Sequence, residues 1–203
     1  MSGTHPRLPG DLAPAGLGDS AASWPVDGSI ERFGNPYLSL RTDAIVDPEG
    51  HVHDRVVVQP RGAVGILALD EDDRVLLVEQ YRHPVQARLL EIPAGTLDVD
   101  GEAAQDAAAR ELIEEGDVAA DVWEELFEIS ATPGYSTERW RLFRATVLHP
   151  VPEQDRAQRH AEEADLKQWW MPLDDAVAAI LDGRISDALT IAGILAEAVR
   201  RRR

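Results

Sequence analysis

The sequence predicts an α+β protein in which a mixed β-sheet lies between helices, with a small antiparallel β-module ahead of it. Three observations lead to this class. Apolar runs typical of strands occur both before and after one Ala-rich segment typical of a helix. Two further helical segments close the chain. This order of strands, helix, strands and two helices is not the regular alternation of a doubly wound fold, which favours α+β.

Composition narrows the possible functions. The 203 residues include 20 Lys and Arg against 37 Asp and Glu, a net charge of −17. This balance disfavours a nucleic-acid partner, because phosphate backbones require clustered cations. The absence of cysteine excludes disulfides, Cys-ligated zinc and thiol nucleophiles. The longest clean apolar run, residues 63–69, is too short to span a bilayer, and no secretory signal is visible. We therefore expect a cytoplasmic protein with no membrane partner.

The first part of the chain divides into a tail and the β-module. Residues 1–25 are rich in Gly, Pro, Ala and Ser without periodicity, which predicts a disordered tail; a strapped-down extended arm is the alternative. Residues 26–58 are predicted to form the module, whose turn lies at residues 47–50. Its short strands are expected at residues 37–40, 44–46 and 56–58. His51 and His53 flank the turn, and we expect unpartnered loop histidines there instead of metal ligands.

Residues 59–203 are predicted to form the main domain. Apolar runs at 63–69 and 75–80 surround an acidic turn, which indicates a hairpin. Residues from about 102 to 115 are Ala-rich and lack Pro, Gly and β-branched side chains until Ile113, which predicts a helix. Later strands are expected at residues 89–92, 126–130, 140–148 and 167–171, and later helices at 172–181 and, capped by Ser186 or Asp187, up to Arg200.

Three carboxylates gather near the end of the central helix. At about 100° per residue, Glu111 and Glu115 lie about 40° apart, and Glu114 lies about 60° to the other side of Glu111. Such like charges repel one another, and the helix dipole disfavours anions at this end. Arg110 can offset only one of them, through Glu114. A hard divalent cation would instead need closely spaced oxygen ligands. For the helix alone, a Glu-rich solvated face remains an equal alternative.

The residues around this helix follow a spaced pattern. In order, the chain has Gly95, Glu102, Arg110, Glu111, Leu112, Glu114, Glu115 and Val118. This series resembles the signature of the Nudix hydrolases, in which Gly and Glu precede Arg-Glu, Glu-Glu, Gly and an aliphatic residue. Two departures stand out: six residues instead of five separate Gly95 from Glu102, and Asp117 replaces the last glycine. Gly116 could then provide the left-handed helix cap one residue early.

The resemblance extends over residues 60–195. Gln80-Tyr81-Arg82 and the segment 133–138, which begins sixteen residues after Asp117, look like the ADP-ribose pyrophosphatase branch. Residues 160–166 resemble the acidic loop that supplies the general base in that branch. The resemblance implies a Nudix α/β/α sandwich that hydrolyses ADP-ribose, or a related nucleoside diphosphate sugar, to AMP and a sugar phosphate. It also implies a homodimer in which the N-terminal strands pack across the two-fold axis.

The resemblance further implies roles for individual residues. Mg²⁺ or Mn²⁺ would be held by Glu111, Glu115, the Ala94 carbonyl and Glu114. Glu163 would act as the general base, with Glu162 as the next choice; the alternative is that both are ordinary loop charges. Substrate would contact Arg82, Gly95, Ser136 and Glu138, and Arg110 would hold the helix carboxylates in position. Arg82 could instead pair with a surface acid, and Ser136 and Glu138 could merely shape a turn.

Two other functions stay open. A pyrophosphatase for another nucleotide sugar or a dinucleotide would keep the metal helix and change the loops that recognise the base. A non-catalytic nucleotide-sensing regulator is disfavoured, because such proteins usually lose signature carboxylates and gain a basic helical domain. Here Glu111, Glu114 and Glu115 are all present, and no basic helical appendage follows.

Overall fold

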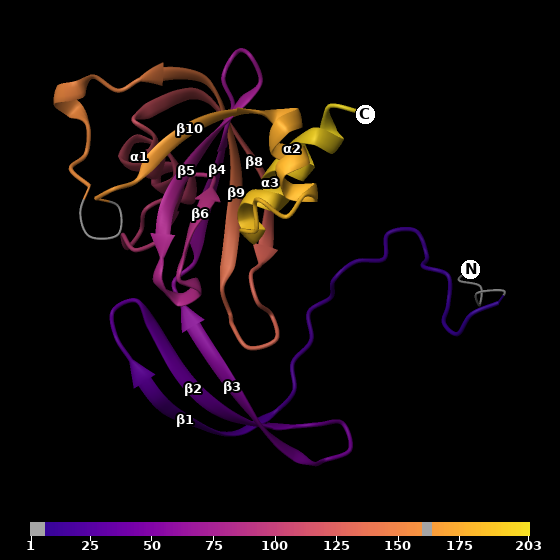
Figure 1. Ribbon diagram of the computed structural model, residues 1–203. Helices are drawn as coiled ribbons and strands as arrows, with labels where there is room; N and C mark the ends of the chain where they lie inside the picture. Colours follow the sequence, from indigo (N-terminus) through magenta and orange to yellow (C-terminus); the bar gives the residue numbers. More distant parts are fainter. Residues whose placement is uncertain (1–6, 160–163) are drawn as a thin grey trace.

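A computed structural model describes residues 7–159 and 164–203 (Figure 1). The strands are β1 Val26–Gly34, β2 Leu38–Val46, β3 Val52–Pro60, β4 Ala63–Ala68, β5 Arg74–Arg82, β6 Ala87–Glu91, β7 Ala94–Thr96, β8 Val118–Ser130, β9 Arg139–Pro150 and β10 Lys167–Pro172. The helices are α1 Ala104–Gly116, α2 Leu173–Leu181 and α3 Ala188–Arg200. Two single 3-10 turns, His83–Val85 and Glu153–Asp155, complete the regular structure of the described residues.

The main body consists of two sheets between helices. One sheet has the order β7-β4-β9-β8 and the other β10-β5-β6. β4 and β9 run parallel and the remaining pairs within these sheets are antiparallel. α1 covers one side, and α2 and α3 cover the other (Figure 1). The predicted α+β class with a mixed sheet between helices is therefore confirmed.

β4 shows how the body holds together. Its residues Val64 and Ile66 are fully buried in a cluster with the alanines of α1, whereas Leu67 is buried in a second cluster with residues of α2 and α3. Successive side chains of a strand point to opposite faces, so β4 supports the cores on both sides.

In the part of the chain that the structure describes, no helix combines the length and the apolar character needed to cross a bilayer.

The predicted hairpin of residues 63–80 is wrong. β4 and β5 make a single bridge, Leu69 to Val75, and then separate into different sheets. β4 pairs with β7 and β9, whereas β5 pairs with β6 and β10. Both strands are buried on both faces, so their continuous apolar runs do not reveal which partner each strand takes.

The β-module is a separate antiparallel sheet with the order β1-β2-β3 (Figure 1). The two strands predicted at residues 37–40 and 44–46 are one continuous strand, β2. Two backbone hydrogen bonds tie the module to the body: the Val58 amide donates to the Tyr135 carbonyl over 2.8 Å, and the Thr137 amide donates to the Val58 carbonyl over 3.0 Å.

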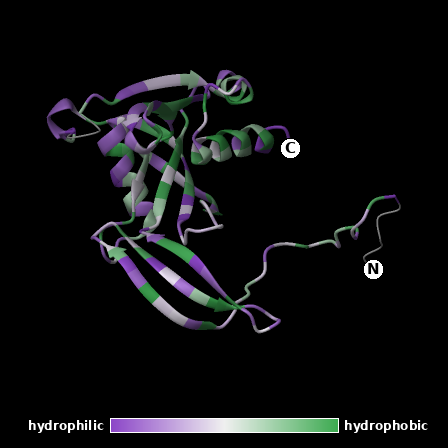
Figure 2. Cartoon of the chain, turned by 60° about the horizontal axis from the view of Figure 1, so that its bottom comes forward, coloured by the Kyte–Doolittle hydropathy of each residue, from purple (hydrophilic) through white to green (hydrophobic). Residues whose placement is uncertain are grey.

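The module exposes apolar side chains. Figure 2 shows apolar and polar residues alternating along its strands. The exposed apolar side chains include Val26, Ile30, Phe33, Val52 and Val56. Such a surface is typical of an interaction site. The preceding residues, 7–25, contain none of the helices or strands and are all exposed; their disorder stays a prediction.

Candidate active site

α1 brings the predicted carboxylates against the sheet. Ala107, Ala108 and Leu112 are fully buried on its inner face. The helix ends at Gly116 and is capped by Asp117, which takes the left-handed conformation with φ 54° and donates its amide to the Ile113 carbonyl. The expectation that Gly116 forms this cap is wrong. Gly116 is needed for close packing instead, because a Cβ there would lie 2.8 Å from the Leu76 side chain.

Gly95 makes room for Glu111. It lies in the middle of β7, which pairs with β4. A Cβ on Gly95 would overlap the carboxyl group of Glu111. The signature glycine therefore allows a helix carboxylate to lie directly against the backbone of β7.

The other two carboxylates differ in burial. Glu115 is only 4% exposed, and its Oε2 accepts a hydrogen bond of 2.9 Å from the Ala94 amide. The Glu114 side chain is 41% exposed. Glu111 and Glu115 thus face β7, and Glu114 lies at the outer margin of the group. The structure shows the Ala94 amide in contact with Glu115, and the role of the Ala94 carbonyl as a metal ligand stays a prediction.

Arg110 links the signature carboxylates to one another. Its Nη1 lies 2.7 Å from Glu111 Oε1 and 3.4 Å from Glu114 Oε2. Its Nη2 lies 3.1 Å from Glu102 Oε2. Hydrogen bonding to Glu102, followed by the charge and the hydrogen bond of Glu111, raises the pKa of Arg110 above its ordinary value. The guanidinium thus holds the side chains of the pattern together.

The site has the character of a divalent-cation site. Burial raises the pKa of Glu111, and the negative charges of Glu114 and Asp98 add to this effect, although Arg110 opposes it. A carboxylate that is costly to ionise in this way is stabilised by a nearby cation. The carboxylates are hard oxygen donors of the kind that Mg²⁺ and Mn²⁺ prefer. The donor type therefore suits a divalent metal ion, whereas the oxygens of Glu111, Glu114 and Glu115 do not, among the described residues, lie close enough together as a set of three to share one ion in this conformation.

A cavity of about 620 Å³ lies beside these carboxylates. Of the predicted substrate residues, it is lined by Arg82, Gly95 and Glu138, together with Ala94. A volume of this size is within the range of small-molecule sites. Its other lining residues are Ala63, Pro84, Glu91, Ile92, Thr96, Trp140, Asp187 and Leu189. Sequence reasoning missed Glu91, Trp140 and Asp187 as residues of the site.

Glu91 holds Arg82 in the cavity wall. Its carboxylate, only 5% exposed, lies 2.6 Å from Nη2 of Arg82 and also accepts from Nε at 3.0 Å. Gln80 donates to the same carboxylate over 3.0 Å. The hydrogen bond with Glu91 raises the pKa of Arg82. Arg82 therefore pairs with an acid, as the alternative stated, but this acid is the buried Glu91 and not a surface residue. The lone charge in the apolar run Leu89–Ile92 was the signal that could have revealed Glu91.

Ser136 does not line this cavity. The Ser136 hydroxyl accepts a hydrogen bond of 3.1 Å from the Glu138 amide, which is a turn-shaping contact. Glu162 and Glu163 lie outside the described residues. The neighbouring Arg159 donates to the main-chain carbonyls of Glu114 and Glu115, so the chain enters this acidic segment at the carboxylate end of α1.

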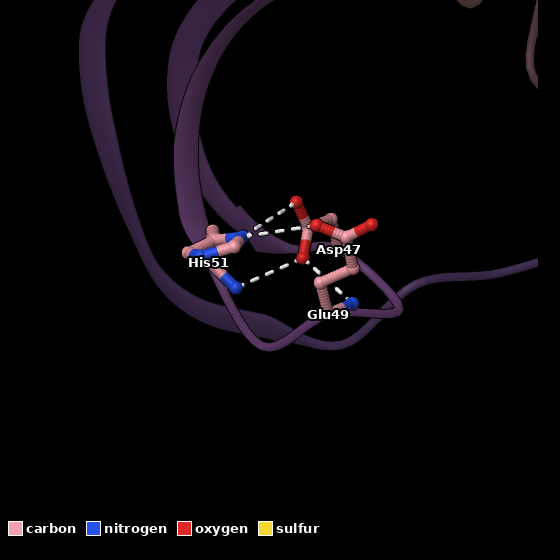
Figure 3. A group of neighbouring side chains, drawn as sticks. All are labelled: Asp47, Glu49 and His51. Atoms are coloured by element: carbon pink, nitrogen blue, oxygen red, sulfur yellow. Dashed lines mark hydrogen bonds and ion pairs between the residues drawn. The ribbon is translucent and has the colours of Figure 1, made fainter.

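A second acidic group lies in the β-module. Within the described residues, Asp47, Glu49 and His51 are the His and acidic side chains that come close enough together to share one ion (Figure 3). Asp47 accepts hydrogen bonds from the backbone amides of Glu49 and His51, and its Oδ2 lies 2.8 Å from His53 Nε2. His51 Nδ1 also lies 3.5 Å from Asp47 Oδ2. The expectation that both histidines are unpartnered is therefore wrong. The contacts within the turn account for this group without an ion.

Comparisons with known proteins agree with the geometry. Residues 59–192 match the family model for the NUDIX domain. The chain is 42% identical over 159 residues to ADP-ribose pyrophosphatase of Mycobacterium tuberculosis (strain ATCC 25618 / H37Rv), covering 78% of this chain and 75% of the relative. It is 30% identical over 162 residues to the methanol dehydrogenase activator of Bacillus methanolicus, covering 80% and 85%.

A solved structure titled as that of an ADP compounds hydrolase shares the fold. Its TM-score is 0.75 at 20% identity, over 91% of this chain and 98% of the other. At that identity the likeness concerns the fold alone, and it confirms the predicted sandwich with its N-terminal antiparallel strands. The family model covers most of the chain, and the signature carboxylates lie together at the end of α1. The chain belongs to the NUDIX domain family.

Proposed function

We propose that this protein hydrolyses the diphosphate of ADP-ribose to AMP and ribose 5-phosphate in the presence of Mg²⁺ or Mn²⁺. The observation that carries the proposal is the meeting of Glu111 and Glu115 with β7 at the edge of the cavity that contains Arg82. A site for a nucleoside diphosphate sugar needs both an anion-binding cavity and carboxylates for a metal ion. The relative named ADP-ribose pyrophosphatase supports this choice among such substrates.

Oxygen atoms at the end of α1 would hold the metal ion. They belong to Glu111, Glu115, Glu114 and the Ala94 carbonyl. When bound, the ion supplies positive charge to the diphosphate and lowers the pKa of a coordinated water. Arg110 keeps the carboxylates in place through its contacts with Glu111 and Glu114.

Arg82 would bind a phosphate or the terminal ribose. Glu91 engages the Nε and Nη2 donors of the guanidinium, so the Nη1 edge is the one suited to reach a substrate. A buried carboxylate that fixes the arginine reduces the entropy lost on binding. Glu163 would accept the proton of the water that attacks phosphorus, and Glu162 is the second choice. The diphosphate P–O bond then breaks and each product keeps one phosphate.

We further propose that the chain is a homodimer joined through residues 26–58. The exposed apolar side chains of this module, among them Ile30 and Val56, support an interface with a second copy. The two backbone bonds at Val58 link the module to the segment that leads to Glu138 in the cavity wall. Contacts made by the module could therefore shape one side of the site.

The decisive experiment is incubation of the purified chain with ADP-ribose, with and without Mg²⁺, and chromatographic identification of the products. We expect AMP and ribose 5-phosphate only with metal. The Glu115→Gln variant should lose turnover and keep its fold, whereas Asp106→Asn, an exposed change on the same helix, should keep both. A panel with GDP-mannose and a dinucleotide tests the alternative substrates. Turnover of those compounds with no cleavage of ADP-ribose would refute the choice of substrate.

A further inference from the structure

Asp117 joins the end of α1 to two distant segments. Its Oδ2 accepts a hydrogen bond of 2.8 Å from Arg159 Nη2 and one of 2.9 Å from Gln168 Nε2. Gln168 lies in β10, and Arg159 lies in the connection between β9 and β10. We call Asp117, Arg159 and Gln168 the α1 clasp.

The clasp satisfies main-chain carbonyls at the end of the helix. Arg159 donates a hydrogen bond from Nε to the Glu114 carbonyl and another from Nη2 to the Glu115 carbonyl. Each donor–acceptor distance is 3.0 Å. Gln168 Nε2 donates to the Glu115 carbonyl over 2.8 Å. The last carbonyls of a helix have no partner within the helix. The clasp therefore fixes the backbone of Glu114 and Glu115, two of the residues proposed above to hold the metal ion.

The positive charge of Arg159 lies at the C-terminal end of α1. Glu111, Glu114 and Glu115 lie at the negative end of the helix dipole, where anions are disfavoured. Arg110 offsets this by binding carboxylates directly. Arg159 instead brings positive charge to the carbonyls of the last turn. It thus supports the geometry of the turn through contacts that do not compete with a metal ion for those carboxylates.

The conformation of Asp117 is difficult to explain by stability alone. Its φ of 54° lies in the region that favours glycine. Its side chain is only 12% exposed. Among the described residues, its Oδ1 has no hydrogen-bond partner, and Arg156 Nε lies 3.9 Å away. A glycine would avoid both the backbone strain and the burial of a charge.

We propose that Asp117 is a positioning residue for the metal-binding carboxylates of α1 and acts through Arg159 and Gln168. This inference rests on the proposed function, since it concerns the aim of Glu111 and Glu115. The clasp fixes the last turn of α1, and with it the direction in which Glu115 leaves the helix toward Ala94. The residue that departs from the family pattern thus takes part in building the site.

Three variants of the full chain test the clasp by calorimetric titration with Mn²⁺ in the absence of nucleotide. Asp117→Gly removes the carboxylate and relieves the backbone, so we expect an unchanged or higher melting temperature with roughly tenfold weaker Mn²⁺ binding. Arg159→Met should weaken binding by a similar factor. Asp117→Asn keeps an oxygen acceptor and tolerates the left-handed conformation, so binding should stay within about threefold of the parent.

Two further proteins sharpen the test. The double variant Asp117→Gly, Arg159→Met should bind no more weakly than either single variant, because both changes break one unit. Arg141→Gln is the control. It removes another arginine–carboxylate pair, in which Arg141 of β9 lies 2.6 Å from Glu125 of β8, and it should leave the Mn²⁺ affinity unchanged.

The outcomes separate the clasp from the proposed function. If the parent chain binds no Mn²⁺, both are overturned. If the parent binds and Asp117→Gly binds equally well, the clasp alone is overturned. It is also overturned if the losses of the two single variants multiply to about a hundredfold, or if Asp117→Asn is as weak as Asp117→Gly.

Discussion

Gly95→Ala places one methyl group where Glu111 now lies. The added Cβ would overlap the carboxyl group of that residue. Gly95 does not have a positive φ, so alanine brings no backbone strain and the effect comes from this contact. The Cβ would lie 1.9 Å from the carboxyl carbon of Glu111. A carbon contact needs about 3.5 Å, so the carboxyl group must retreat by roughly 1.6 Å. A displacement of about 1 Å can cost roughly a hundredfold in rate, and forced overpacking costs about 1–3 kcal/mol.

We therefore expect Gly95→Ala to lower turnover of ADP-ribose about a hundredfold and the free energy of unfolding by about 1 kcal/mol. Product formation and urea unfolding measure the two effects. Gly193→Ala is the matched control, since a Cβ there meets Leu142 at an ordinary 3.4 Å. In a Glu111→Ala background, Gly95→Ala should no longer destabilise the protein. An equal loss of stability in both backgrounds, or turnover within twofold of the parent, would refute the reasoning.

Three further predictions concern other parts of the molecule. Burial would raise the pKa of Glu197, yet Arg201, Arg144 and Arg200 hold it below its ordinary value. Its stabilising effect is therefore present above the unfolded pKa of about 4.3 and is lost as pH falls through the folded pKa. Glu197→Gln should cost about 3 kcal/mol at pH 7, with a difference from the parent that shrinks below about pH 4, as pH-dependent urea unfolding would show; a constant difference would contradict this. Arg82→Lys should raise KM for ADP-ribose roughly tenfold, because lysine cannot contact Glu91 and substrate in the same way, and steady-state kinetics measures it. Ile30→Asp should convert a dimer to a monomer in gel filtration, and an unchanged elution volume would argue against the interface.

Individual helices and strands could be predicted from the sequence better than the pairing between strands. α1 was predictable because its alanines favour helix throughout and its buried face repeats with the helical period. The pairing of β4 was not, because an acidic turn between two apolar runs looks the same whether the strands pair or separate. Ser186 and Asp187 were both candidates for the N-cap of α3. The structure shows that Asp187 is the cap, since its side chain accepts a hydrogen bond from the Thr190 amide.

The candidate site shows the same division. The carboxylates of α1 follow from one local pattern, so their common edge could be predicted from helix geometry. The cavity is assembled from β4, β5, β6, β7, β9 and the start of α3, and no single segment shows that Glu91, Trp140 and Asp187 meet there. The preference of glycine for the left-handed conformation pointed to Gly116. The structure gives that conformation to Asp117, and Gly116 instead packs closely against Leu76.

The end of α1 combines three unfavourable features: like charges close together, anions at the negative end of the dipole, and a buried glutamate. Three separate contacts compensate for them. Arg110 binds Glu111 and Glu114, the Ala94 amide donates to Glu115, and the α1 clasp satisfies the last carbonyls. Without these carboxylates the helix end would need none of this compensation. Carboxylates that are unfavourable in themselves and yet held in place by these contacts are what the proposed site requires, because such a site gains its remaining stabilisation from a bound cation.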